Sequence, residues 1–234
     1  MPRTKTKTQQ RGCFITFEGT EGSGKSLQMR LLMEHFSNRG IACVVTREPG
    51  GTAFGDRLRE ILLESDGPAR VPVAELLLYL SDRYQDLAEI IEPALADGKH
   101  VLCDRYHDAT RAYQGFARGV DLQLIDSISR RLGIRKPDLT FLLDLPTETG
   151  LQRARGRNLK EESHLGRFEE ESLRFHRRVR RAYRLFTRQE PQRFRVINAS
   201  GPAEAIHVRI LKELTLFFRN FRPGTKPGCG RRCW

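Results

Sequence analysis

The stretch GTEGSGKS, Gly19 to Ser26, follows directly on the apolar run CFITFE and constrains the fold more than any other part of the chain. It matches the pattern G-x-x-x-x-G-K-[ST], which lies between a strand and a helix. The glycines let backbone N–H groups turn inward around phosphate oxygens, and the N-terminus of the following helix adds its positive dipole end. The stretch therefore predicts a strand, a phosphate-binding turn and a helix, with a nucleoside triphosphate held in the turn.

Each residue type in this turn has an expected role in binding ATP and Mg²⁺. We expect Lys25 to bridge the β- and γ-phosphates and Ser26 to ligate Mg²⁺. Asp104 ends a later predicted strand, HVLCD, and is suited to hold Mg²⁺ directly or through water. The predicted ATP-binding residues are Gly19, Thr20, Glu21, Gly22, Ser23, Gly24, Lys25 and Ser26.

Strand-like and helix-like segments alternate from residue 13 to residue 221. The predicted strands are 13–18, 42–46, 100–104, 139–145 and 194–198, and they are continuous apolar runs, which is typical of a parallel sheet covered on both faces. The predicted helices are 26–39, 56–64, 73–96 with a kink near Pro93, 121–132, 147–157, 168–189 and 202–221. This alternation predicts a doubly wound α/β fold with a five-stranded parallel sheet and helices on both faces.

Charge and composition limit the classes of protein to which the chain can belong. The net charge is +12, and the basic residues are concentrated in both tails and between residues 153 and 195. Such tails are typical of nucleic-acid binding or of solubilising extensions. No apolar run approaches the length of a membrane span, and the N-terminus has no apolar signal segment, so we expect a cytoplasmic protein without a membrane partner. The five cysteines indicate no disulfide framework.

Two arginines indicate that the second substrate is phosphorylated. TREPGGT (46–52) and DRYHDATRAYQG (104–115) are interpreted as loops after predicted strands, at the sheet edge where α/β proteins bind ligands. Arg47 and Arg105 lie just past the two strand ends, and a guanidinium holds a phosphate through two parallel hydrogen bonds. Either arginine alone could form a surface ion pair, but the two together favour a phosphorylated acceptor.

Tyr79 and Arg83 are one helical turn apart, so they share a helix face. Their side chains could stack on a base and hydrogen-bond to it. Because Tyr79 lies in the apolar stretch ELLLYL, the residues alone favour a core tyrosine.

Five motifs together resemble those of thymidylate kinases. FEGTEGSGKS, TREPGGT, YLSDRY, DRY…AYQG and RARGR occur in that family's order and spacing, over about residues 12–215. The resemblance implies a nucleoside-monophosphate kinase domain over residues 12–222 with a lid at about 153–167. The basic tails at 1–11 and 223–234 are predicted from their composition to be disordered. It also implies that the chain forms a homodimer and transfers the γ-phosphate of ATP to dTMP in dTTP biosynthesis.

The resemblance assigns roles to individual residues. Tyr79 matches an aromatic residue that stacks on thymine, and Arg83 matches an arginine that reaches a base carbonyl. Arg47 and Arg105 match the residues that hold the monophosphate, and Glu21 matches a carboxylate beside the deoxyribose 3′-hydroxyl and the acceptor phosphate. The base-side polar positions are Thr110 and Gln114. Ala109 and Gly166 depart from the family pattern, which commonly has Ser and Asp there.

Two rival functions remain open at this stage. Another nucleoside-monophosphate kinase, for dUMP, UMP or CMP, would share the same spacing. A nucleic-acid-binding P-loop ATPase would use the basic tails. Because the phosphate-binding arginines lie in the body of the chain and the tails have few aromatic residues for stacking, we do not expect a nucleic-acid partner.

The lid generates a first testable prediction. The P-loop interior, residues 20–23, has no positive charge, so the lid must supply the arginine that neutralises the transferring phosphoryl group. Arg153 and Arg157 share a helix face, and Arg155 points away from it. We therefore expect Arg157→Ala to lower kcat by about a hundredfold or more, Arg153→Ala somewhat less, and Arg155→Ala by under about fivefold. Steady-state kinetics on the three variants will test this. A small loss of kcat in Arg157→Ala together with a large loss in Arg155→Ala would contradict the assignment of Arg153 and Arg157 to the face turned to the phosphates.

Overall fold

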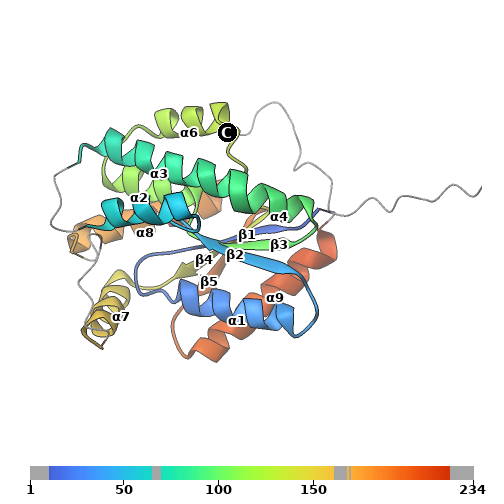
Figure 1. Ribbon diagram of the computed structural model, residues 1–234. Coiled ribbons are helices and arrows are strands. Elements are labelled where there is room, and N and C mark those ends of the chain that lie inside the picture. The colour runs from blue at the N-terminus through green and yellow to red at the C-terminus, as the bar shows by residue number, and fades with distance from the viewer. Residues whose placement is uncertain (1–10, 65–69, 161–167, 169, 222–234) are drawn as a thin grey trace, which may run out of the picture.

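Five parallel strands form a single sheet in the order β2-β3-β1-β4-β5 in a computed structural model (Figure 1). The structure describes residues 11–64, 70–160, 168 and 170–221. The strands are β1 (Phe14–Glu18), β2 (Cys43–Arg47), β3 (His100–Asp104), β4 (Leu139–Asp144) and β5 (Phe194–Asn198). Every predicted strand is confirmed to within one residue at each end. The central position of β1 places the turn that follows it in the middle of the sheet's carboxyl edge.

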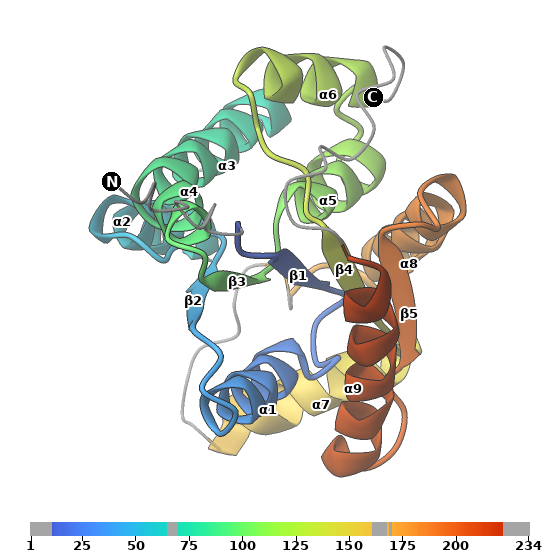
Figure 2. The ribbon, with the colours of Figure 1, turned by 90° about the vertical axis from the view of Figure 1, so that its right-hand side faces the viewer.

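Helices cover both faces of the sheet, as predicted for a doubly wound fold (Figure 2). On one face lie α1 (Lys25–Ser37) and α9 (Ala203–Asn220). The other face is covered by α3 (Pro72–Asp86), the π-helix η1 (Leu87–Ile91), α4 (Glu92–Ala96), the π-helix η2 (Arg111–Ala117) and α8 (Leu173–Gln189). The remaining helices are α2 (Ala53–Leu63), α5 (His107–Thr110), α6 (Leu122–Arg131) and α7 (Thr147–Lys160).

The buried strand β1 divides the core into two layers. Ile15 and Phe17 pack with Leu32 of α1 and Ile210 of α9, whereas Phe14 packs with Ile91 on the opposite face. All five residues of β1 are buried, which explains why its sequence is mostly apolar. Its one charged residue, Glu18, connects the sheet to the functional site.

The interpretation of residues 104–115 as a loop is wrong. After Asp104 the chain spans two loop residues and then enters α5 and the π-helix η2, which together run from His107 to Ala117. The sequence gives little helical signal there because hydrogen bonds of the i→i+5 type do not follow the 3.6-residue period on which the prediction rests. Residues 107–117 therefore lie on a rigid element.

Two other helix predictions are refined by the structure. The predicted helix at 73–96 is α3, η1 and α4, with the π-helical turn lying just before Pro93, which has no N–H to donate. The predicted helix at 168–189 begins only at Leu173, because the Ser172 side chain caps it and accepts a hydrogen bond from the Phe175 N–H at 3.2 Å.

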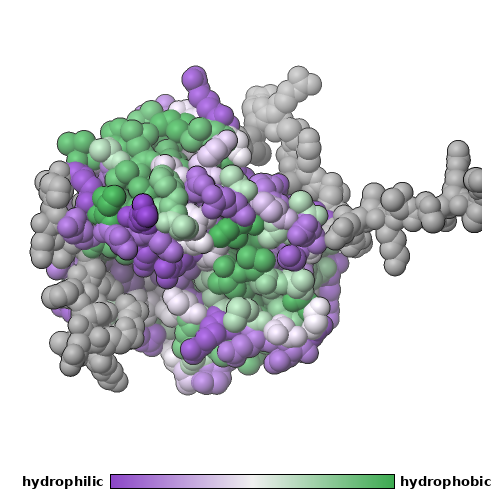
Figure 3. Space-filling view, viewed as in Figure 1, coloured by the Kyte–Doolittle hydropathy of each residue, from purple (hydrophilic) through white to green (hydrophobic). Residues whose placement is uncertain are grey.

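The chain ends and the surface relate to the predicted basic tails and to the expectation of no membrane span. Residues 1–10 and 223–234 lie outside the described residues, but Arg11, assigned to the N-terminal tail, forms a 2.7 Å ion pair with Asp138. Hydrophobic side chains gather on the surface over α2 and α3 (Figure 3). None of the helices in the described part of the chain is long and apolar enough to cross a membrane.

Candidate active site

The carboxyl edge of the sheet gathers the motifs that the sequence singles out. Strand β3 lies between β1 and β2, with Asp104 in register with Phe17 on one side and with Arg47 on the other. The turn after β1, the part of TREPGGT that follows β2 and Arg105 after β3 therefore begin at one edge. This is the edge at which parallel α/β sheets bind ligands.

The predicted phosphate-binding turn has the conformation that its sequence requires. Gly22 and Gly24 have positive φ angles, of 67° and 91°, which side chains rarely tolerate. A Cβ atom on Gly22 would lie 2.0 Å from the carbonyl oxygen of Gly150, so the turn packs closely against α7. Lys25 begins α1, and its Nζ donates to the carbonyl oxygens of Gly19 and Thr20, each at 3.1 Å. Burial, reinforced by Arg105, lowers the pKa of Lys25 to about 8.

Ser26 and Asp104 form a pair that suits a magnesium ion. The Ser26 hydroxyl donates to Oδ2 of Asp104 at 2.8 Å. The other oxygen of this carboxylate, Oδ1, is buried and has no hydrogen-bond partner among the described residues. A hydroxyl and a carboxylate with a spare oxygen are hard ligands of the kind that Mg²⁺ prefers.

Glu21 and Arg105 form a buried ion pair at the centre of the site. Nη2 of Arg105 lies 2.9 Å from Oε1 of Glu21, and Nη1 of Arg105 donates to the Gly19 carbonyl at 3.1 Å. The Tyr113 hydroxyl also donates to Oε1 of Glu21, at 2.6 Å, and Nδ1 of His176 lies 3.0 Å from Oε2. Burial alone would raise the pKa of Glu21, but Arg105 and His176 outweigh it and lower the pKa to about 2. Glu21 therefore stays a carboxylate and fixes the Arg105 guanidinium in place.

A second buried carboxylate, Glu18, fixes the backbone around Arg105. Its Oε1 accepts hydrogen bonds from the N–H groups of Tyr106, at 2.9 Å, and Ala109, at 3.3 Å, while the Tyr183 hydroxyl donates to Oε2 at 2.7 Å. Burial raises the pKa of Glu18 to about 7. Arg105 has a φ of 64° and is the one residue other than glycine with a positive φ in the described part of the chain. Glu18 therefore holds the segment that directly follows a costly backbone conformation.

Two further arginines lie beside this pair. Arg47 ends β2, and its Nη2 lies 3.0 Å from Oδ1 of Asp56, with more than half of each side chain exposed. Arg59 of α2 donates to the Pro49 carbonyl at 2.8 Å. Burial and the neighbouring charges of Arg47 and Arg105 lower the pKa of Arg59. The edge of the sheet therefore carries a group of cations suited to an anionic ligand.

Comparison with known proteins identifies the family to which this arrangement belongs. The thymidylate kinase family model matches residues 17–210. The thymidylate kinase of Desulfosudis oleivorans is 49% identical over 205 residues, which cover 86% of this chain and 95% of that protein. The thymidylate kinase of Syntrophotalea carbinolica is 50% identical over 199 residues, covering 84% and 92%. The chain belongs to the thymidylate kinase family. Its members are ATP-dependent nucleoside-monophosphate kinases.

A solved structure supports the same assignment. The crystal structure of thymidylate kinase from Ehrlichia chaffeensis superposes with a TM-score of 0.71 at 31% identity, over 88% of this chain and 99% of that one. The predicted fold class is thus confirmed.

The residues expected to contact the base lie on α3, α5 and η2. Tyr79 is 8% exposed and shares the buried face of α3 with Arg83. The Arg83 guanidinium donates to Oε2 of Glu48 from Nε at 2.8 Å and to the Thr110 hydroxyl at 3.0 Å. Gln114 donates to Oε1 of Glu75 at 2.9 Å. The structure brings Arg83 and Thr110 into direct contact, and their roles toward a base stay predictions.

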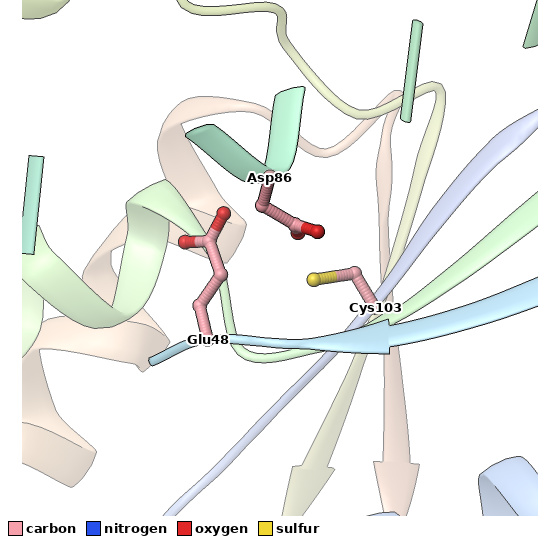
Figure 4. A group of neighbouring side chains, drawn as sticks. All are labelled: Glu48, Asp86 and Cys103. Carbon is pink, nitrogen blue, oxygen red and sulfur yellow. The ribbon is translucent and has the colours of Figure 1, made fainter. Parts of the chain in front are cut away.

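Glu48 belongs to a buried group that supports the TREPGGT segment. The side chains of Glu48 after β2, Asp86 of α3 and Cys103 of β3 point toward one another (Figure 4), and one ligand-type atom of each lies within 4.8 Å of the others. Burial raises the pKa of Asp86 to about 7 and raises that of Glu48 well above its ordinary value. The Thr46 hydroxyl donates to Oδ1 of Asp86 at 2.7 Å. Asp86 thus holds Thr46 at the start of the segment, and Glu48 connects the segment to Arg83.

The lid arginines are placed only in part. The predicted helix is confirmed as α7, so Arg153 and Arg157 do share a helix face. Nη1 of Arg153 donates to the Ala199 carbonyl in the turn after β5, at 3.3 Å. The side chain of Arg157 and the whole of residues 161–167, which include Gly166, lie outside the described residues.

Sequence reasoning missed His176, Tyr113, Glu18 and Arg59. His176 is fully buried on α8, 155 positions from Glu21 along the chain, and no motif connects the two. The one signal for Glu18 was a carboxylate at the end of a continuous apolar strand, where a buried charge needs partners.

His176 generates a prediction about acceptor binding. Replacing it with Phe removes the nitrogen beside Oε2 of Glu21 and leaves that buried oxygen without its neighbour, so the ion pair with Arg105 loosens. We expect His176→Phe to raise the KM for dTMP by about tenfold, from a loss of about 1–3 kcal/mol, with less than a threefold change in the KM for ATP.

The matched control is His107→Phe, since His107 is also buried and lies 3.4 Å from the carboxylate of Asp126. It tests the general cost of losing a buried histidine. Both variants are expected to melt at a lower temperature than the wild-type chain, but only His176→Phe should raise the KM for dTMP. An equal rise in KM in both would show that the effect is one of stability alone.

Proposed function

We propose that the chain transfers the γ-phosphate of ATP to dTMP and releases ADP and dTDP. The observation that carries the proposal is the buried pair of Glu21 and Arg105, which joins the ATP-binding turn to the segment after β3. A guanidinium held in that position can bind the acceptor phosphate next to the transferring one. A reaction that consumes ATP and supplies dTTP synthesis points to the cytoplasm as its location.

The acceptor is a phosphate oxygen that is already ionised near pH 7, so the reaction needs no strong general base. The barrier comes from repulsion between two anions, and catalysis consists of positioning and charge neutralisation. Lys25 holds the β- and γ-phosphates, while Arg47, Arg59 and Arg105 hold the acceptor phosphate. Arg153 and Arg157 of α7 contribute positive charge from the lid side.

The donor set fits a magnesium ion at Ser26 and Asp104. The unpartnered Oδ1 of Asp104 and the Ser26 hydroxyl beside Oδ2 supply two oxygens for such an ion. When bound, Mg²⁺ neutralises charge on the β- and γ-phosphates. Asp104 also accepts the Ser26 hydrogen bond, which positions the first turn of α1 toward the phosphates.

Acceptor choice rests on α3 and the start of η2. Tyr79 supplies an aromatic face for the base, and Arg83, Thr110 and Gln114 supply polar groups around it. Glu48 and Thr110 together fix the Arg83 guanidinium, so the N–H groups that it does not use for these contacts point in one direction. A fixed donor discriminates between bases more sharply than a mobile one does.

A homodimer is supported by the apolar face of α2 and α3. Val73, Leu77 and Tyr84 lie on one side of α3 and are each about half exposed, and Phe54 and Ile61 of α2 are similarly exposed. Figure 3 shows hydrophobic surface over these two helices. A contiguous apolar patch of this kind is typical of a protein interface, and a second copy of the chain is the proposed partner.

The acceptor assignment predicts a clear order of substrates. In an assay that couples ADP release to a spectroscopic signal, dTMP should have the highest kcat/KM, well above UMP and CMP. dUMP should fall below dTMP by about 10–200-fold, because one methyl contact in a snug pocket contributes about 1–3 kcal/mol. Equal turnover of UMP and dTMP would refute the assignment, and ADP release stimulated only by single-stranded DNA would favour the ATPase alternative.

The interface predicts that one buried charge will dissociate the dimer. Leu77→Glu places a carboxylate in the centre of the apolar face, where it would lose its hydration on association. We expect the wild-type chain to have twice the monomer mass in light scattering at micromolar concentration, and the variant to have the monomer mass. Leu216→Glu on α9, where the leucine is 43% exposed on the opposite face of the sheet, is the control and should remain dimeric. A monomeric wild-type chain would contradict the proposal.

A further inference from the structure

Helix α8 concentrates positive charge to an unusual degree. Between Leu173 and Gln189 the sequence contains seven arginines and no acidic residue. The apolar side of the helix, which includes Val179, Tyr183 and Phe186, is buried against the sheet and η2. The arginines are therefore directed to the outer side, which Figure 2 shows facing away from the sheet.

Six of these seven arginines line a groove of about 850 Å³ on the outer side of α8. Its walls come from α8, from the start of α7 and from the end of η2. The lining residues are Phe116, Thr147, Glu148, Arg177, Arg178, Arg180, Arg181, Arg184, Leu185 and Arg188. Six of the ten are arginines, and one is an acid.

Only part of this charge is neutralised within the described chain. Arg177 pairs with Glu148, and Arg180 forms two hydrogen bonds with Asp144, at 2.6 and 3.1 Å. Arg181, Arg184 and Arg188 are exposed, and their guanidinium groups make no ion pair or hydrogen bond with another described residue. Three neighbouring guanidinium groups without counter-charges repel one another, so an anion that spans them would be stabilised.

The spacing of these arginines suits an extended anion. Positions 181, 184 and 188 follow the i, i+3, i+7 pattern and share one helix face with Arg177. From Arg177 to Arg188 the helix rises about 16 Å at 1.5 Å per residue. That distance corresponds to about five nucleotides of one strand, at about 3.4 Å each along the axis.

The lining favours a phosphate backbone over an acidic protein surface. Protein interfaces have an apolar centre, whereas Phe116 and Leu185 are the two apolar side chains in the described lining of this groove. Binding to a nucleic-acid backbone requires cations at the centre and no apolar core, and guanidinium groups bind phosphate oxygens through paired hydrogen bonds.

We propose that the groove on the outer side of α8 binds the phosphate backbone of nucleic acid without sequence preference. From the sequence we expected no nucleic-acid partner, because that expectation rested on the tails. The arginines of α8 come together on one face only in the folded chain. The groove does not compete with the phosphoryl-transfer site, since His176 contacts Glu21 from the buried side of the same helix. Kinase activity and nucleic-acid binding are thus expected to be separable.

Fluorescence anisotropy with the full chain and a labelled 24-base-pair DNA duplex of mixed sequence tests the proposal. The test variant is Arg181→Gln/Arg184→Gln/Arg188→Gln. Its matched control, Arg30→Gln/Arg130→Gln/Arg219→Gln, removes the same charge from exposed positions on three other helices. The dissociation constant is measured between 50 and 300 mM NaCl, and kcat/KM for dTMP is measured for each variant.

We expect the groove variant to bind about tenfold or more weakly and its salt slope to fall by about 2.7, since each duplex phosphate contact contributes about 0.9. The control should bind DNA less than about threefold more weakly than the wild-type chain. Both variants should keep kcat/KM for dTMP within about twofold of the wild-type value. Equal weakening in the two variants would overturn the proposal, because bulk charge would then explain binding. The proposal would also be overturned if the chain did not bind the duplex, or if polyglutamate displaced the duplex as well as unlabelled DNA does. A chain that binds inorganic polyphosphate but not the duplex would overturn it too.

Discussion

The buried carboxylate of Glu21 is the interaction on which the rest of the site depends. It joins four segments that are far apart in the sequence: the phosphate-binding turn itself, Arg105 after β3, Tyr113 of η2 and His176 of α8. Removing one partner from a buried ion pair typically costs about 3–5 kcal/mol, because the other charge is left without compensation. Glu21 therefore links the donor side of the site to the acceptor side, and neither can move far without the other.

The same constraint explains how this site can hold charge before substrates arrive. Arg105 adopts a left-handed backbone conformation, and Glu18 secures the neighbouring N–H groups of Tyr106 and Ala109 from below. A cation fixed in this way needs little reorganisation when phosphoryl charge develops, which is the usual source of electrostatic catalysis. The family assignment and the geometry thus agree on a reaction in which positioning of anions, rather than proton transfer, dominates.

The sequence predicted the parts of this arrangement that depend on local patterns. The strand–turn–helix around Gly19 to Ser26, the five strands and the shared face of Tyr79 and Arg83 follow from short-range periodicity and glycine chemistry. The π-helix from Arg111 to Ala117 was missed because its hydrogen bonding breaks that periodicity. The partners of Glu21 and of Arg83 were missed because buried polar pairs form between segments that are far apart in the sequence. No short-range pattern in the sequence indicates such pairs. The groove on α8 likewise appears only when folding places all of its arginines outside.

A double-mutant cycle on dTMP binding tests most directly whether Glu21 and Arg105 act as one unit. Calorimetry would give the dissociation constants of the wild-type chain, Glu21→Gln, Arg105→Gln and the double variant, with thermal melting used to confirm that each is folded. The account predicts strong coupling, of about 1–3 kcal/mol, so that the double variant loses much less affinity than the two single losses combined. Losses that add to within about 0.5 kcal/mol would show that Arg105 holds its position without Glu21, and would contradict the account.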